Sequence, residues 1–138
     1  MRILVTRGSG VIGIAAIEEL VQRRHHVRLL SRDGDDHAKR WTGVEAFPAD
    51  VTDAASVHGA ADGCDAVLHI AGVSADVVGT RNIVAEAVRA GARRFVYVSS
   101  LDHQSKREAE AIVAGSELRW TIVRPRDMST VPETRWPR

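Results

Sequence analysis

The chain has 138 residues, of which 44% are hydrophobic and 27% are charged, and its formal net charge is +1. This size and composition are those of one soluble globular domain, and the small net charge gives no reason to expect nucleic acid as a partner. The single cysteine, Cys64, excludes an internal disulfide, and no apolar run is long enough to cross a membrane.

The first stretch predicts a strand, a glycine-rich turn and a helix. The apolar, β-branched run Arg2–Thr6 is typical of a strand, and Val11–Arg24 carries apolar residues at helical spacing. The turn Gly8–Gly13 reads G-x-G-x-x-G. Glycines in such a turn bring backbone N–H groups against a pyrophosphate, and the helix N-terminus adds partial positive charge. This context favours dinucleotide binding; the alternative is a tight strand-to-helix turn without a ligand.

Strands and helices alternate through the rest of the chain. This alternation predicts one α/β domain of Rossmann type, with helices on both faces of a parallel sheet of about six strands in the order 3-2-1-4-5-6. We expect it to cover residues 1–138, with no separate substrate domain. The further predicted strands are His26–Ser31, Glu45–Ala49, Ala66–Ala71, Arg94–Ser99 and Arg119–Val123. The further predicted helices are Ala54–Ala61, Ala75–Ala90 and His103–Ala114, with at most a short helix near Asp36–Trp41.

The carboxyl ends of the parallel strands meet at one edge of the sheet, here called the rim. Right-handed crossovers bring them together there, and open α/β sheets bind their ligands at this edge. We therefore expect a cofactor to lie across the rim. The rim collects Thr6, Arg7, Gly8, Ser9, Gly10, Val11, Ile12, Gly13, Ser31, Arg32, Asp50, Val51, Ala71, Gly72, Ser99, Ser100, Arg124 and Pro125.

A series of segments, in this order, matches the pattern of one known family. They are Ile3–Thr6 with Gly10–Gly13, Ser31-Arg32, Ala49–Asp53, Gly63–His69, Gly79–Asn82, Arg94–Ser100, Ser105–Glu110 and Trp120–Pro125. Through them the chain resembles an atypical, NmrA-like short-chain dehydrogenase/reductase, also called an NAD(P)H-binding-domain protein. The resemblance covers nearly the whole chain and implies a Rossmann fold that binds NAD or NADP.

The first turn departs from the family pattern Thr-Gly-x-x-Gly-x-x-Gly. Arg7 stands where the first of those glycines belongs, and Gly8 is shifted by one position. A guanidinium presents a fork of donors that suits a phosphate. Arg7 therefore either contacts a phosphate of the cofactor or leans away into solvent.

The Tyr-x-x-x-Lys pair that many members carry is incomplete. Lys106 is present, but Asp102 stands four residues earlier, and the only tyrosine, Tyr97, lies within a predicted strand, where we expect a structural role. The segments before Asp76 and before Lys106 are shorter than the corresponding segments of the family members. The chain also ends soon after Pro125, where relatives build a substrate-binding region. The resemblance thus implies a reduced substrate wall.

Ser31-Arg32 ends the second predicted strand, where the family places the adenosine ribose. NAD-preferring relatives carry an acid at the position of Ser31, whereas a serine followed by arginine favours a 2′-phosphate. NADP(H) is therefore expected more than NAD(H). The alternative is a solvated Arg32 that pairs with a following acid, Asp33, Asp35 or Asp36, for little gain in stability.

The resemblance also assigns roles at the adenine and pyrophosphate. Asp50-Val51 would contact the adenine; alternatively, Asp50 makes only a local turn hydrogen bond. Ala71-Gly72 would let the ribose and pyrophosphate approach the backbone, because both residues are small.

The candidate catalytic residues are Ser99, Ser100 and Lys106. By resemblance, the serines would hydrogen-bond a substrate carbonyl and Lys106 would hold the nicotinamide ribose. The alternative for Lys106 is an exposed helix residue that pairs with Glu110. The histidine and cysteine spacings predict no metal site, and His69, within a strand, is expected to be a core histidine.

Two functions of different classes remain open. The first is a small NADP(H)-dependent oxidoreductase; the second is a non-catalytic NADP(H) sensor or binding module, which the missing tyrosine and short loops favour. A third is non-redox cyclisation or isomerisation in a repurposed pocket, and the fold alone does not decide among them. We further expect a small-molecule substrate or none, a cytoplasmic location, no signal peptide, no nucleic acid or membrane partner, and a homo-oligomer with Trp120 and Trp136 as candidate contacts.

Overall fold

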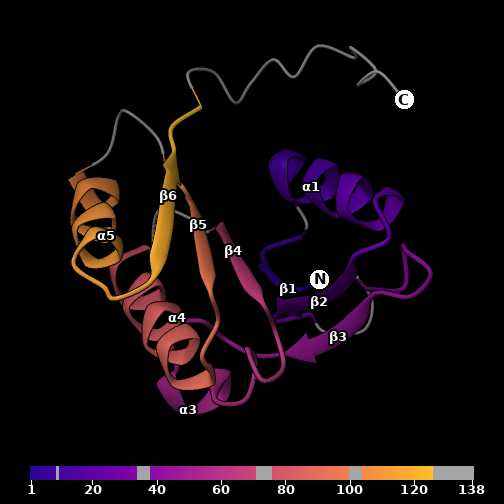
Figure 1. Cartoon of the computed structure of the whole chain (residues 1–138), viewed down its shortest axis with the longest axis horizontal. Coiled ribbons are helices and arrows are strands. Elements are labelled where there is room, and N and C mark those ends of the chain that lie inside the picture. The colour runs from indigo at the N-terminus through magenta and orange to yellow at the C-terminus, as the bar shows by residue number, and fades with distance from the viewer. Residues whose placement is uncertain (9, 34–37, 71–75, 100–103, 126–138) are drawn as a thin grey trace.

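The computed structural model describes residues 1–8, 10–33, 38–70, 76–99 and 104–125. These residues form one six-stranded sheet in the order β3-β2-β1-β4-β5-β6. Every neighbouring pair of strands is parallel, so the predicted strand order and the α/β Rossmann fold are confirmed (Figure 1). The strands are β1 (Arg2–Thr6), β2 (His26–Ser31), β3 (Glu45–Pro48), β4 (Ala66–Ile70), β5 (Arg94–Val98) and β6 (Arg119–Val123).

The described helices lie on both faces of the sheet. They are α1 (Val11–Gln22), α3 (Ala54–Val57), α4 (Asp76–Ala90) and α5 (Gln104–Ala114). Helix α1 packs on one face, and α3, α4 and α5 lie on the other (Figure 1). The two helical layers therefore differ in size, and the face of the sheet that carries α4 and α5 holds the larger hydrophobic core.

Two buried clusters hold the layers together, as the alternation of side chains along each strand requires. The smaller joins α1 to the sheet, through Ile17 against Val5 and Leu29. The larger lies under α4 and α5 and includes Phe95 and Tyr97, which are both fully buried. Strands β1, β4 and β5 bury residues on both faces of the sheet, and for this reason their sequences are mostly continuous apolar runs.

Two predicted helices are shorter in the structure. The first ends at Gln22 rather than Arg24, because Arg24 has a left-handed φ of +62° that stops the helix. The predicted helix Ala54–Ala61 ends at Val57. Beyond it, the carbonyl of Ala60 accepts a hydrogen bond from Arg28, and the N–H of Ala61 donates to Glu86. These tertiary bonds replace the helical ones that the sequence pattern predicted.

The remaining boundaries differ by one residue. The strands predicted to end at Ala49 and Ser99 end at Pro48 and Val98, and the helix predicted from His103 begins at Gln104 within the described residues. Ala71 and Ala75, at two other predicted boundaries, lie outside the described residues, as do Asp36 and His37 of the segment Asp36–Trp41. Strand β6 forms one edge of the sheet, and its residues Trp120 and Val123 are 44% and 43% exposed.

Candidate functional site

The turn after β1 is packed so closely that one of its glycines is required. A Cβ on Gly13 would lie 2.2 Å from the carbonyl oxygen of Arg7, a backbone atom that cannot move aside. A Cβ on Gly8 would lie 2.7 Å from Ile17 Cδ1 and 2.8 Å from Leu29 Cδ1. Gly13 thus lets α1 begin directly against the end of β1, which is the close helix–strand packing that such a turn needs.

Gly10 differs from these two glycines because nothing crowds it. Apart from its chain neighbours, no heavy atom of the described residues lies within 4 Å of the position of a Cβ there, and its φ of −83° suits any residue. Gly10 is the N-cap of α1, and no side chain of the described residues caps this helix end. The first N–H groups of α1 therefore have no side-chain acceptor among the described residues, which is the condition that an anion-binding helix N-terminus requires.

Arg7 adopts a left-handed backbone, with φ of +59°. Glycine reaches this region without strain, whereas a residue with a Cβ pays about 1–2 kcal/mol. The turn has thus kept the backbone shape that the family's glycine would favour, although the sequence places arginine there. The residue is exposed and its N–H donates to the carbonyl of Leu30 at 3.3 Å.

The ends of β2 and β3 bring Ser31, Arg32 and Asp50 to the same part of the rim. The hydroxyl of Ser31 is buried without a hydrogen-bond partner among the described residues, while Arg32 is exposed. Asp50 Oδ1 accepts hydrogen bonds from the N–H and hydroxyl of Thr52, at 2.9 and 2.7 Å. These bonds hold the pKa of Asp50 below its usual value, and the charge of Arg32 adds to the effect. The local turn bond considered for Asp50 is thus present.

Buried polar side chains connect the end of β1 to α4. The hydroxyl of Thr6 lies 3.0 Å from Nδ1 of His69, and Nε2 of His69 lies 2.9 Å from the hydroxyl of Thr80. Thr6 also binds the backbone of Ile70, accepting from its N–H at 2.8 Å and donating to its carbonyl at 3.1 Å. Burial, aided by the charge of Lys106, lowers the pKa of His69 to about 3, so the ring is neutral at pH 7. The expected core histidine is confirmed.

A second buried group, here called the rim cluster, consists of Asp76, Tyr97 and Lys106. Tyr97 donates to Asp76 Oδ1 at 2.7 Å, and Lys106 Nζ lies 3.2 Å from Oδ1 and 3.0 Å from Oδ2. The ammonium is also 5.6 Å from the centre of the Tyr97 ring. Burial, and then the contact with Asp76, raises the pKa of Tyr97 far above its usual value. Tyr97 therefore has the structural role expected of it.

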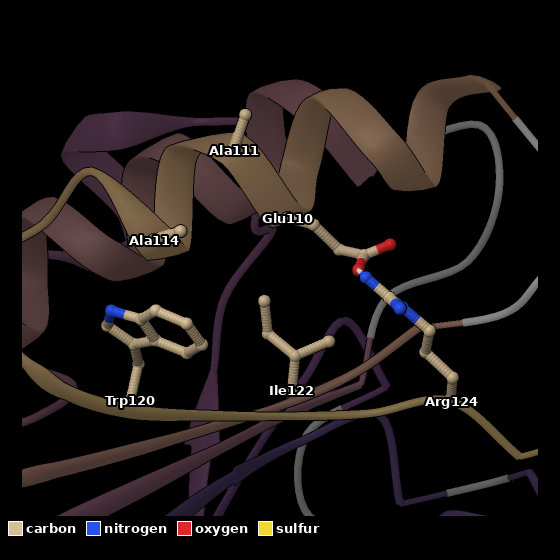
Figure 2. A pocket seen from close by; sticks show the side chains of 6 residues that line it. All are labelled: Glu110, Ala111, Ala114, Trp120, Ile122 and Arg124. Carbon is tan, nitrogen blue, oxygen red and sulfur yellow. Dashed lines mark hydrogen bonds and ion pairs between the residues drawn. The ribbon is translucent and has the colours of Figure 1, made fainter.

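The end of β5 points a candidate serine toward α5. Ser99 is 1% exposed, and its hydroxyl donates to Glu110 Oε2 at 3.0 Å. Glu110 in turn accepts from Arg124 Nε at 2.7 Å, an ion pair between α5 and the residue after β6 (Figure 2). The carboxylate of Glu110 and the guanidinium of Arg124 close one end of an open groove of about 600 Å³, which Trp120 and Ile122 also line. The alternative pairing of Lys106 with Glu110 is replaced by the pairs Lys106–Asp76 and Arg124–Glu110.

Several predicted site residues lie outside the described residues. They are Ser9, Ala71, Gly72 and Ser100. Among the residues that the structure describes, no three histidine, cysteine or acidic side chains gather as a metal site would require. Within the same residues, no helix is both long and apolar enough to cross a membrane.

The model of one protein family, described as NAD(P)H-binding, matches residues 8–137. The chain belongs to this family. The match spans the glycine turn, the rim and β6, and the resemblance to atypical short-chain dehydrogenase/reductases is thereby confirmed.

Curated relatives of this NAD(P)H-binding chain include reductases and dehydrogenases. Cinnamoyl-CoA reductase 1 of Oryza sativa subsp. japonica is 39% identical over 114 residues, which cover 71% of this chain and 34% of that protein. A 3 beta-hydroxysteroid dehydrogenase/Delta 5-->4-isomerase of Mycobacterium tuberculosis is 32% identical over 117 residues, which cover 72% of this chain and 31% of that protein. The chain thus spans about a third of the length of these relatives.

Solved structures share the fold of this family member. ChuY, described as an anaerobillin reductase from Escherichia coli O157:H7, aligns with a TM-score of 0.80 at 23% identity, over 91% of this chain and 72% of its own. The Bordetella bronchiseptica enzyme WbmG, in complex with NAD and UDP, aligns with a TM-score of 0.78 at 22% identity, over 90% of this chain and 52% of its own. At these identities the likeness establishes the Rossmann-like fold.

Sequence reasoning about this NAD(P)H-binding domain missed Asp76 as the partner of Lys106 and Glu110 as the partner of Ser99. Asp76 resembles an ordinary acid in the first turn of a helix, where a negative charge is favourable in any protein. Glu110 resembles a solvated helix residue. One signal was available: both acids lie on helices that must cover a sheet, so an acid on the sheet-facing side needs a partner.

Proposed function

We propose that this chain binds NADP(H) in preference to NAD(H) and is a small NADPH-dependent oxidoreductase of the atypical short-chain dehydrogenase/reductase type. The observation that carries the proposal is the N-terminus of α1 at Gly10, which no side chain of the described residues caps and where a Cβ would meet no atom beyond its chain neighbours. Backbone N–H groups at such a helix end bind a pyrophosphate, and a glycine there lets the phosphate approach closely. Asp50-Val51 and Ala71-Gly72 complete the proposed cofactor site on the rim.

Ser31 and Arg32 support the preference for NADP(H). The hydroxyl of Ser31 is buried without a partner among the described residues, and Arg32 is exposed beside it on the chain. A 2′-phosphate supplies acceptors for both donors, whereas the 2′-hydroxyl of NAD supplies no charge for the guanidinium.

Arg32→Ala tests this preference. We expect the affinity for NADPH to fall about tenfold or more, the size of a lost charge-assisted hydrogen bond, while the affinity for NADH changes little. Isothermal titration calorimetry of both cofactors measures the two losses. Arg23→Ala, at the exposed far end of α1, is the matched control. Equal losses for NADPH and NADH would overturn the preference.

The proposed reaction is reduction of a carbonyl. When bound, the nicotinamide supplies the hydride, and the chain supplies binding, orientation and electrostatic stabilisation. Ser100 is the proposed donor to the carbonyl oxygen, because the hydroxyl of Ser99 already donates to Glu110. Tyr97 is buried and bound to Asp76, so the proton is proposed to come from solvent or substrate. Ser100→Ala should lower kcat about tenfold or more with little change in cofactor affinity.

A non-catalytic NADP(H) sensor is the second candidate. Two observations favour it: Ser99 and Tyr97 both have hydroxyls committed to buried carboxylates. Consumption of NADPH against a panel of carbonyls, quinones and flavins separates the two functions. Turnover of any of these compounds favours the oxidoreductase; tight NADPH binding with no turnover favours the sensor.

Assembly and location stay predictions. We propose a homo-oligomer in which the exposed side chain of Trp120 on the edge strand β6 is covered by a second copy. Trp120→Glu should then yield a monomer in light scattering, whereas a monomeric wild-type chain at high concentration would contradict the proposal. A cytoplasmic location and a small-molecule partner remain expected.

A further inference from the structure

Asp76 is the most deeply buried carboxylate of the described residues and lies at the first position of α4. Its side chain is 0% exposed, and that of Lys106, its partner from α5, is 7% exposed. The two residues are separated by 30 positions in the sequence but their charged atoms lie 3.0 Å apart. This ion pair joins the beginnings of two helices that both start at the rim.

The groups around the pair identify the source of the balancing charge. Tyr97 from β5 offers a neutral phenol that donates to Asp76. His69 from β4 is neutral, and Glu110 on α5 itself is engaged by Ser99 and Arg124. Lys106 is therefore the cation that meets the charge of Asp76.

Burial makes each charge depend on the other. A buried ion that loses its partner is strongly disfavoured, and a buried ammonium without a counter-charge gives up its proton more readily. The rim cluster also fixes the ammonium in space, because α4, β5 and α5 each contribute one of its three side chains.

We propose that Asp76 is the positioning residue for Lys106: its carboxylate balances the buried charge of the ammonium and holds it at the rim, where it binds the ribose of the cofactor. This inference rests on the proposed function, because it assigns Lys106 to the cofactor. Asp76 itself touches no reacting atom in this scheme. A purely structural pair would instead stabilise the fold without affecting how cofactor affinity changes with pH.

The test is the affinity for NADPH, measured by fluorescence titration of the whole chain between pH 7 and 9.5. A phosphate monoester has its second pKa near 6, so the 2′-phosphate keeps its full charge throughout this range. We expect nearly constant affinity in the wild type. In Asp76→Asn, affinity should fall about tenfold across the range, as Lys106 loses its proton. Tyr97→Phe is the matched control: it removes a hydrogen bond from the same carboxylate but no charge, so the constant profile should persist.

The outcomes separate this inference from the proposed function. A wild type that binds neither NADPH nor NADH overturns the proposed function, whereas a wild type and an Asp76→Asn variant with the same pH profile overturn the role of Asp76. If Asp76→Asn does not fold, the double variant Asp76→Asn/Lys106→Gln carries the test, since both charges are then absent. Affinity equal to that of Lys106→Gln supports the proposal, because Asp76 then acts only through Lys106; an affinity lower than that of Lys106→Gln, or wild-type affinity in the double variant, overturns it.

Discussion

Two clusters of charged side chains, each with buried members, lie at opposite ends of the same sheet. The rim cluster, Asp76, Tyr97 and Lys106, lies where the strands end. A second cluster, here called the base cluster, consists of Arg28, Glu86 and Arg89, and lies toward the amino ends of the strands. Both lie on the side of the sheet that carries α4.

The two clusters differ in what their charges bind. Arg28 donates to the backbone carbonyls of Ala60 at 2.8 Å and Asp62 at 2.9 Å, and Glu86 accepts from the N–H of Ala61 at 3.1 Å. Burial alone would raise the pKa of Glu86, but Arg89 and the N–H of Ala61 outweigh it and hold that pKa below its usual value. The base cluster thus satisfies the irregular connection before β4, which forms no helix.

In the rim cluster, Asp76 instead binds the side chains of Tyr97 and Lys106. The comparison of the rim cluster with the base cluster teaches that similar buried charges can have different roles. Where the partners are backbone groups of one connection, the charge holds the fold. Where they are side chains from several elements at the rim, we propose that the charge is placed for cofactor binding.

The largest expected effect on stability is at the base cluster. Arg28→Met should lower the free energy of unfolding by about 3 kcal/mol, because a buried carbonyl and a part-buried one lose their donor and Glu45 loses its partner. Cofactor affinity, measured on the folded fraction, should change little. Urea denaturation provides the measurement. Arg23→Met, which removes an exposed pair with Glu19, should cost less than about 0.5 kcal/mol. A comparable loss in both variants would refute the assignment of the base cluster.

The next effect concerns pH and the buried network beside the rim cluster. Native His69 has a pKa of about 3, whereas its unfolded value is near 6.5. The unfolded state therefore binds more protons below pH 6.5, and stability should fall by about 2 kcal/mol between pH 7 and pH 5. Urea denaturation at each pH measures the slope. His69→Gln should reduce it, and His58→Gln, at an exposed position, should not. An unchanged slope in His69→Gln would show that other groups cause it.

A third pair of variants separates folding from binding at the glycine turn. Gly13→Ala should lower the free energy of unfolding by about 2 kcal/mol, because its Cβ would collide with the Arg7 carbonyl. Gly10→Ala has open space and should stay within about 0.5 kcal/mol of the wild type, yet it should weaken NADPH binding because its methyl group enters the phosphate position. Thermal unfolding and calorimetry report the two effects. Unaltered NADPH binding in Gly10→Ala would contradict the proposed site.

The smallest expected effect is at Arg7. Arg7→Gly should raise the free energy of unfolding by about 0.5 kcal/mol, because relief of the left-handed backbone exceeds the entropy that glycine adds to the unfolded chain. Its effect on NADPH affinity distinguishes the two roles of the side chain. A loss of about tenfold indicates a contact with phosphate, and no loss indicates a solvated side chain. A variant less stable than the wild type would show that the side chain itself stabilises the turn.

The sequence by itself determined the order of the elements and the position of the rim. Strand β1, the glycine turn and α1 follow from local patterns: an apolar β-branched run, a G-x-G-x-x-G turn and a helical spacing. Alternation then implied parallel strands in the order 3-2-1-4-5-6. These predictions succeeded because periodicity and turn chemistry depend on residues that are close together in the chain.

Only the tertiary structure decided which side chains meet. The sequence offered Lys106 a partner four residues away in Glu110, but the packing of α4 against α5 brought it to Asp76 instead. The placement of α5 beside β5 likewise brings the Ser99 hydroxyl within hydrogen-bonding distance of Glu110. The segment after Val57 is not helical because Arg28 and Glu86 bind its backbone groups. Such pairings depend on the relative placement of whole elements, and a buried charge accepts whichever partner that placement brings within hydrogen-bonding distance.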